Sequence, residues 1–250
     1  MSGHSKWSTI KRKKAATDAK RGQLFTRLAR EIALAARKGG DTTTNFSLRM
    51  AIEKARASNM PKDNIDRAIK RGTGELKGDE LQEVLYEGYG PHGVAMLIQV
   101  VTDNRNRSVA DIRKVFNRRG GTVAEPGAVA WQFKQKGYFT LLSEGLDGDH
   151  VFEVALEADA DDVVFGDDLT EVFTSVDAFQ QVREGLQGAK IEVESAELSF
   201  FPDMPVTLEH TNALQVMGVI DALEELDDVQ QVYSTLDVSD ELMAAYEVAS

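Results

Sequence analysis

The amino-terminal end of the chain holds the residues whose types and spacing most clearly predict chemistry. Seven cations fall within sixteen positions and are opposed only by Asp18. Lys and Arg neutralise phosphates and release condensed counterions, which gives affinity for any nucleic-acid backbone. Trp7 lies among these cations and offers a ring on which an exposed base can stack. The segment therefore predicts a nucleic-acid-binding site made of Lys6, Trp7, Lys11, Arg12, Lys13, Lys14, Lys20 and Arg21.

The net charge of the chain divides sharply along its length. The whole chain carries −12, but residues 1–80 contain 19 Lys and Arg against 9 Asp and Glu, a net charge of +10. The other 170 residues contain 10 Lys and Arg against 32 Asp and Glu, a net charge of −22. Solubility alone does not require charges to segregate in this way. The division predicts a polyanion-binding module joined to a part that stays off the polyanion.

A second basic cluster lies inside the acidic part of the chain. Arg105, Arg107, Arg113 and Lys114 are candidates for a secondary basic site, and Arg118-Arg119 follows them near the end of a predicted helix. Cations at a helix C-terminus interact favourably with the helix dipole. A structural role and a binding role therefore stay open for this cluster.

The sequence lacks the motifs of several common catalytic and metal sites. It has no cysteine, no phosphate-binding loop of the GxxxxGK[ST] form, no HExxH and no GxSxG, and its four histidines are widely separated. The acidic runs 159–162 and 167–168 do not have the spacing of a calcium loop. We expect a protein that is not an enzyme and that has no metal and no cofactor. With no apolar run of signal-peptide or membrane-spanning length, we also expect a soluble, cytoplasmic protein without a membrane partner.

Hydrophobic periodicity predicts three helices in the basic part. Apolar residues recur at steps of three and four over Asp18–Lys38 and Phe46–Ser58, and a third helix that begins near Pro61 ends at Gly72. The glycine-rich residues 72–79 suggest a linker. Brief connections between short helices are typical of a small bundle.

The acidic part alternates strands and helices. Strand Gly93–Val101, helix Ser108–Arg119 and strands Thr122–Ala124 and Ala128–Phe133 give the order β-α-β-β. A complete βαββαβ unit follows over 138–200, and the helix and strand over 211–236 supply what the first block lacks. The fold class is therefore α+β, a three-helix domain followed by two ferredoxin-like α/β domains, one inserted in the other. We expect domains at residues 1–78, at 79–135 with 205–250, and at 136–204.

Several motifs, in this order, resemble the signatures of the YebC family along essentially the whole chain. They are Gly3-His4-Ser5-Lys6-Trp7, Lys20-Arg21-Gly22, Asn59-Met60-Pro61-Lys62-Asp63-Asn64-Ile65, Tyr86-Glu87-Gly88-Tyr89-Gly90-Pro91, Thr102-Asp103-Asn104-Arg105-Asn106-Arg107 and Asp227-Asp228-Val229-Gln230. The resemblance implies a helical first domain and two α/β domains. It also implies either a DNA-binding transcriptional regulator, as bacterial members are described, or a factor that acts on the ribosome to relieve stalled translation.

Three functions therefore stay open at the level of sequence. A DNA-binding regulator would place the basic domain on a duplex and turn the acidic domains away or toward the transcription machinery. A ribosome-associated translation factor would place the basic arm on ribosomal RNA, and an arm with an interleaved Trp and little core suits irregular RNA. A protein-only scaffold would make the basic region incidental.

Overall fold

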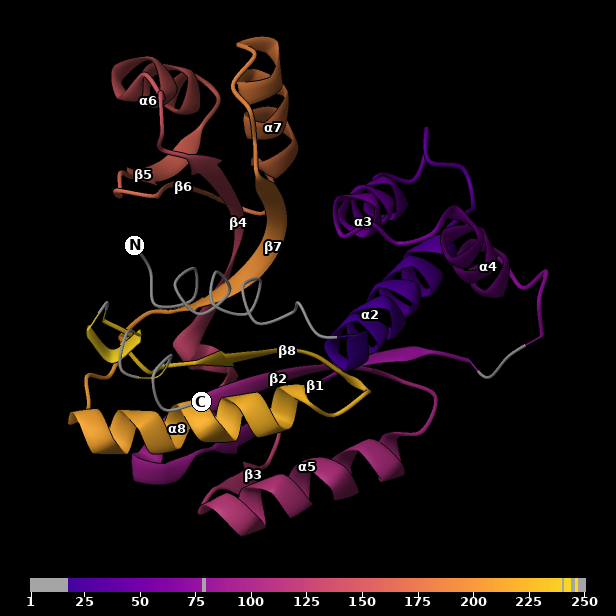
Figure 1. Ribbon diagram of the computed structural model, residues 1–250, viewed down its shortest axis with the longest axis vertical. Coiled ribbons are helices and arrows are strands. Elements are labelled where there is room, and N and C mark those ends of the chain that lie inside the picture. The colour runs from indigo at the N-terminus through magenta and orange to yellow at the C-terminus, as the bar shows by residue number, and fades with distance from the viewer. Residues whose placement is uncertain (1–17, 78–79, 240, 244–245, 247–250) are drawn as a thin grey trace.

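The computed structural model describes residues 18–77, 80–239, 241–243 and 246, and it divides into helices followed by two antiparallel sheets (Figure 1). The first unit consists of helices α2 (Asp18–Ala36), α3 (Phe46–Ala57) and α4 (Lys62–Gly72). These helices confirm the three-helix prediction, and their ends differ from the predicted ends by two residues or fewer.

The three helices share one apolar core. Its fully or nearly buried members come from every helix and from the connection between α3 and α4, which supplies Met60. The helical members are Leu28, Ile32, Ala36, Leu48, Ala51, Ile52, Ala55, Ile65 and Ala68. Asn45 caps α3 by accepting a hydrogen bond from the backbone N–H of Leu48 at 3.1 Å, and its amide donates to the carbonyl of Ala35 at 2.8 Å. The cap therefore both starts α3 and ties it to the end of α2.

The first sheet has the strand order β3-β1-β2-β8 and is antiparallel throughout. Its strands are β1 (Gln82–Tyr89), β2 (Ala95–Thr102), β3 (Thr122–Ala124) and β8 (Val229–Ser234). Helices α5 (Arg105–Arg119) and α8 (His210–Glu224) cover the same face (Figure 1) and bury Ile112, Phe116 and Val216 against it.

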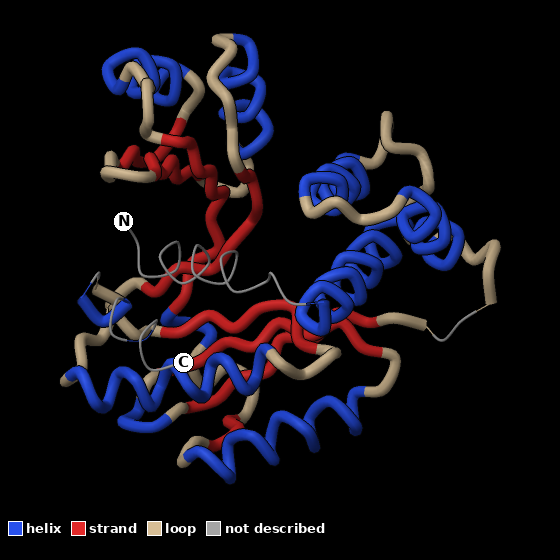
Figure 2. The backbone as a smooth tube through the Cα atoms, viewed as in Figure 1, coloured by secondary structure: helices blue, strands red, loops and turns tan. Residues whose placement is uncertain are grey.

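The second sheet has the order β5-β6-β4-β7 and lies entirely between β3 and α8 in the sequence. Its strands are β4 (Phe133–Leu142), β5 (Ala160–Val164), β6 (Leu169–Thr174) and β7 (Ser195–Pro202), and its helices are α6 (Gly148–Glu157) and α7 (Phe179–Gly188). The chain order βαββαβ and the strand order are those of a ferredoxin-like sheet, as predicted. Figure 2 shows this inserted unit standing above the first sheet.

One strand of the first sheet was predicted at the wrong place. Ala128–Phe133 is not a strand, because it contains a short 3-10 helix at Ala130–Gln132, and Phe133 begins β4 of the other sheet. The position between β3 and β2 is filled instead by β1, which pairs with both. The buried carboxylate of Glu87 in β1 accepts the N–H groups of Gly127 and Val129, each at 2.6 Å, and of Ala130 at 2.9 Å. These donors are therefore satisfied by a side chain and not by a sheet ladder.

Candidate nucleic-acid interface

Most of the predicted amino-terminal site lies outside the described residues. This applies to Lys6, Trp7 and the run from Lys11 to Lys14, so their arrangement stays a prediction. Lys20 and Arg21 lie in the first turn of α2. Arg21 is exposed, and its guanidinium carbon lies 5.9 Å from the centroid of the Phe25 ring.

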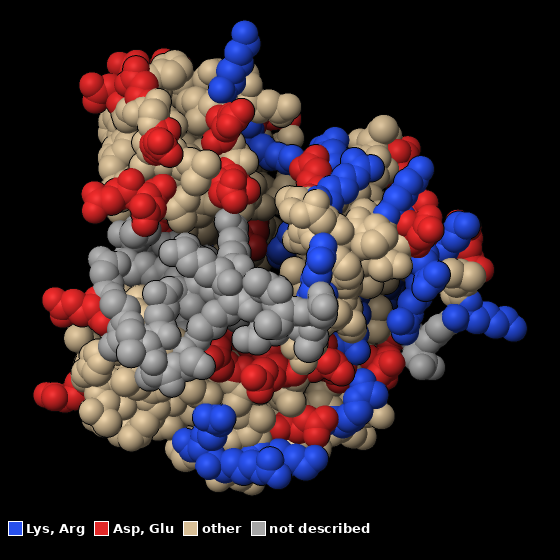
Figure 3. Space-filling model, in the orientation of Figure 1, with Lys and Arg blue, Asp and Glu red and all other residues tan. Residues whose placement is uncertain are grey.

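The described helical unit is itself basic. Residues 18–77 contain 14 Lys and Arg against 7 Asp and Glu, a net charge of +7. Many of these cations are exposed: Arg21, Arg37, Lys38, Lys54, Arg56, Lys62, Arg67, Lys70, Arg71 and Lys77. Figure 3 shows Lys and Arg gathered over this unit, whereas Asp and Glu dominate the visible face of the inserted unit.

Helix α4 presents a charged face to solvent. Ile65 and Ala68 point into the core, which leaves Lys62, Arg67, Lys70 and Arg71 exposed. None of these four cations forms an ion pair with another described residue. They are therefore available to phosphates, although two exposed carboxylates, Asp63 and Asp66, share the helix.

A pocket of about 310 Å³ opens beside α2 and α4. Its lining includes the cations Arg37, Arg71 and Lys77 together with Glu80. Arg37 is already engaged, because it forms an ion pair with Glu80 and donates to the carbonyl of Leu81 at 2.6 Å. The two other cations make the pocket an extension of the basic surface of α4.

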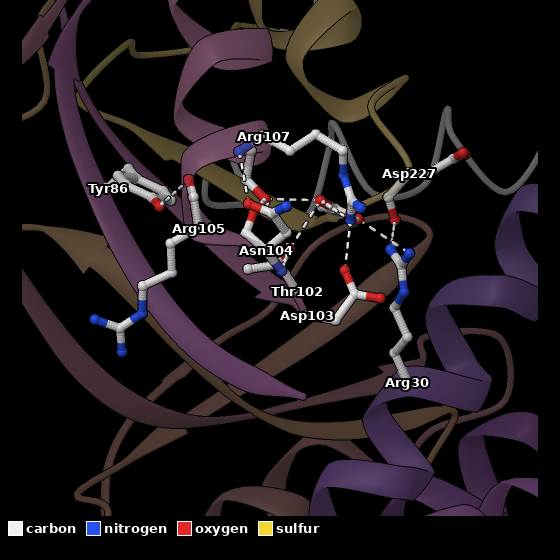
Figure 4. Close-up of polar contacts among 10 residues, drawn as sticks. Arg30, Tyr86, Thr102, Asp103, Asn104, Arg105, Arg107 and Asp227 are labelled. Carbon is white, nitrogen blue, oxygen red and sulfur yellow. Dashed lines mark hydrogen bonds and ion pairs between the residues drawn. The ribbon is translucent and has the colours of Figure 1, made fainter. Parts of the chain in front are cut away.

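A buried carboxylate joins the helical unit to the first sheet (Figure 4). Asp228 accepts hydrogen bonds from Thr102 at 2.9 Å, from Ser108 at 2.7 Å and from Arg107 at 2.9 Å. Arg30 of α2 adds an ion pair at 3.0 Å and also donates to the carbonyl of the neighbouring Asp227. Two motifs far apart in the sequence, 102–107 and 227–230, therefore meet at one acceptor.

The protonation state of Asp228 follows from these contacts. Burial raises the pKa of this carboxyl, but the hydrogen bonds from Ser108, Arg107 and Thr102 lower it by more, so the pKa is held below its ordinary value. Asp228 is therefore ionised at neutral pH, and Arg107 and Arg30 neutralise it. Arg30 was not among the predicted site residues, because its position in a helix gave no signal of a distant partner.

The four cations of the second predicted basic cluster differ in whether they form ion pairs. Arg107 is committed to Asp228 and Asp103. Lys114 forms an exposed ion pair with Asp111 at 3.2 Å. Arg105 and Arg113 are exposed and form no ion pair with another described residue. Two of the four cations are thus free to bind, and one is structural.

The helical unit also contacts the inserted unit. Phe46 of α3 packs edge-on against Phe179 of α7 with ring centroids 6.1 Å apart, and Arg183 forms an ion pair with Glu53. The Lys54 ammonium lies 3.3 Å from Glu31 and 3.5 Å from Glu197. The attraction of Glu31 is the largest cause that raises the pKa of Lys54. The basic surface is therefore held against both α/β units.

The described residues contain no group of three or more His, Asp or Glu side chains placed to hold a metal ion. In the same residues, no helix is both long enough and apolar enough to cross a membrane.

The fold and the charge distribution define a class of protein with a basic helical module carried on two nested, acidic α/β units. The family model described as the TACO1/YebC protein N-terminal domain matches residues 5–75, and the model described as TACO1/YebC second and third domain matches residues 81–236. The chain therefore belongs to the TACO1/YebC family.

Similar proteins support the same assignment over nearly the full length. A probable transcriptional regulatory protein of Desulforapulum autotrophicum is 49% identical and matches 98% of this chain and 100% of its own length. One of Geobacter sulfurreducens is 51% identical, matching 97% of this chain and 98% of its own. The crystal structure of a conserved hypothetical protein from Aquifex aeolicus superposes with a TM-score of 0.82 at 40% identity, covering 89% of this chain and 93% of its own.

Proposed function

We propose that the protein is a non-enzymatic, nucleic-acid-binding regulator of gene expression, and that its target is DNA. The observation that carries this proposal is the segregation of charge between folded units. The described helical residues 18–77 carry a net charge of +7, whereas residues 133–204, which form the inserted unit, contain 4 Lys and Arg against 17 Asp and Glu, a net charge of −13. A phosphate backbone is attracted to the first surface and repelled by the second, which orients the protein on its target.

The names of the relatives support a role in transcription, since the two compared above are called probable transcriptional regulatory proteins. The connection between α3 and α4 is also short, running over residues 58–61. Two helices joined by a turn of this length are the building block of many DNA-binding domains, in which the second helix enters the major groove. In this chain that second helix is α4, with its four exposed cations.

The charge of α4 also supports a second candidate, a translation factor that binds ribosomal RNA. Asp63 and Asp66 are exposed near the N-terminus of α4. That end of a recognition helix contacts the base edges of a duplex, where two carboxylates lie close to the phosphates. Irregular RNA places its phosphates less regularly, so the cations of α4 can be used while the carboxylates stay in solvent.

The two candidates are separated by an experiment in cells. Crosslinking of the protein to chromosomal DNA is compared with its co-sedimentation with ribosomes from the same gently lysed culture. Discrete DNA peaks without ribosome association support the DNA regulator. Ribosome association that is lost when Lys11, Arg12, Lys13 and Lys14 are replaced by Ala, without DNA enrichment, would replace it with the translation factor. Absence from both fractions would contradict the proposal as a whole.

A further inference from the structure

Helix α5 carries all the cations of its unit. Residues 81–132 and 205–250, which include the first sheet and its helices, contain 6 Lys and Arg against 15 Asp and Glu, and every one of the six lies between Arg105 and Arg119. The only carboxylate within the helix is Asp111. An otherwise acidic unit thus has one basic element, which Figure 3 shows as a cluster of Lys and Arg at the lower edge of the molecule.

The cations of α5 are arranged on its outer side. Ser108, Ile112 and Phe116 are buried and define the side that faces the sheet. Lys114 and Arg118 are spaced by four residues and therefore share a face, and Arg113 lies beside them. All three are exposed.

The fold makes little use of these three cations. Arg113 and Arg118 form no ion pair with another described residue, and the pair of Lys114 with Asp111 is exposed on both sides, so it contributes little. The helix dipole favours a cation only in the last turn, which accounts for Arg118 but not for Arg113 or Lys114, in the middle of the helix. Their gathering on one surface is therefore better explained by a ligand than by stability.

We infer that the outer face of α5, formed by Arg113, Lys114 and Arg118, is a second contact for the phosphate backbone of the nucleic acid. This inference rests on the proposed function, and it gives the nucleic acid a second binding surface besides the helical unit. Arg107 in the first turn of α5 and Arg30 in α2 both bind Asp228, so α5 is fixed relative to the basic helical unit. One nucleic acid that is bound at both surfaces gains affinity without a further ordering cost.

The ligand chemistry is the phosphate diester backbone, which duplex DNA and ribosomal RNA share. The test measures the Kd of the whole protein for a 30-base-pair DNA duplex and for a fragment of ribosomal RNA over a series of salt concentrations. The variant Arg113→Gln, Lys114→Gln, Arg118→Gln keeps good helix formers in α5. The matched control, Lys134→Gln, Lys136→Gln, Lys190→Gln, removes the same charge from the inserted unit.

We expect the α5 variant to lower the slope of log K against log salt by about 2.7 on the duplex, about 0.9 for each lost phosphate contact. The control leaves the slope unchanged, and Arg113→Lys with Arg118→Lys preserves the wild-type slope, because both replacements keep the charge. A larger effect on one of the two nucleic acids identifies which source the surface binds.

Two other outcomes are distinguishable. A wild-type protein that binds neither nucleic acid overturns the proposed function together with this inference. A wild-type protein that binds, with an unchanged slope in a folded α5 variant, overturns the second contact alone. Circular dichroism of α5 variants establishes the folded state, and if the triple variant unfolds, the charge-reducing pair Arg113→Gln, Arg118→Gln gives the same test with an expected change of about 1.8.

Discussion

The side chains of Arg30 in α2 and Asp228, the residue that precedes β8, form an ion pair of 3.0 Å, with only 16% and 10% of their side-chain surfaces exposed. Breaking such a pair by removing one partner is costly because the other charge stays buried and uncompensated. This contact, together with the packing of Ala33 and Leu34 of α2 against Leu81 and Val101, holds the basic helical unit against the first sheet.

Replacement of Asp228 by Asn is expected to lower the free energy of unfolding by about 3 kcal/mol at pH 7, because Arg30 and Arg107 lose their shared acceptor charge. The folded-state pKa of Asp228 lies below its ordinary value, so its contribution is present above about pH 4 and is lost as the pH falls through the folded-state pKa. Urea unfolding at pH 7 and at pH 3 measures both effects, and the difference between wild type and variant should shrink at the lower pH.

Asp227→Asn provides the control for this prediction. Asp227 is exposed, and Arg30 uses its backbone carbonyl, which the substitution keeps. We expect a change of at most about 0.5 kcal/mol. Equal losses in the two variants would show that the ion pair with Arg30 does not hold the units together.

Glu87 anchors the loop that precedes β4, and its replacement by Gln is expected to release that loop. Burial raises the pKa of Glu87, but the backbone hydrogen bonds from Gly127, Val129 and Ala130 lower it by more. The pKa of Glu87 therefore lies below the ordinary value for glutamate. The uncharged amide is a weaker acceptor, so we expect a loss of about 2 kcal/mol. Hydrogen exchange of the three backbone amides, followed by NMR, should become faster by at least about tenfold.

The same strand supplies the control for Glu87. Glu83 is exposed and accepts a hydrogen bond from Gln99 at 2.6 Å, away from the loop. Glu83→Gln should leave the exchange of the three loop amides at the wild-type rate. Unchanged exchange in Glu87→Gln would mean that the loop is held by other contacts.

Gly72 permits α4 to pack against α2, and its replacement by Ala is expected to destabilise the helical unit. A Cβ atom at this position would lie 2.2 Å from the carbonyl oxygen of Ala33 and 2.6 Å from the Cβ of Ala36. Relief of this overlap requires a shift of the helices and costs about 1–3 kcal/mol. Gly22→Ala in α2 is the control, because nothing lies within 4 Å of its added Cβ.

Thermal unfolding measures both glycine variants. Gly22→Ala should raise Tm slightly, since Ala is favoured over Gly by about 1 kcal/mol inside a helix. Gly72→Ala should lower Tm. A rise in Tm for both variants would show that the close approach of α2 and α4 is not required.

Elements with strong periodicity could be predicted from the sequence, whereas one strand with a mixed pattern could not. The apolar spacing of Leu28, Ile32 and Ala36 leads directly to α2, since those residues form one buried face. Strand β1 was missed because it contains Glu83 and Glu87 and alternates poorly. The reason that Glu87 is tolerated there lies in a loop some forty residues away in the sequence, which no local pattern reveals.

The sequence predicts where basic residues cluster, but it does not predict which of them remain unpaired in the folded protein. Clustering of Lys and Arg along the chain located the basic surfaces, because net charge is a property of composition. Whether a given cation is unpaired depends on which carboxylates the fold places beside it. In the sequence, Arg107 and Arg113 belong to one basic cluster. Only the structure shows that Arg107 forms an ion pair with Asp228, whereas Arg113 forms none with a described carboxylate.

The most direct test of the central claim is the salt dependence of nucleic-acid binding by the whole protein and by the variant Lys11→Ala, Arg12→Ala, Lys13→Ala, Lys14→Ala. Binding to duplexes of several unrelated sequences is measured by fluorescence anisotropy. We expect the variant to bind all of them more weakly by a similar factor and to lower the salt slope by about 3.6, about 0.9 for each cation that contacts a phosphate. Binding of the variant with the affinity and slope of the wild type would contradict the proposed site.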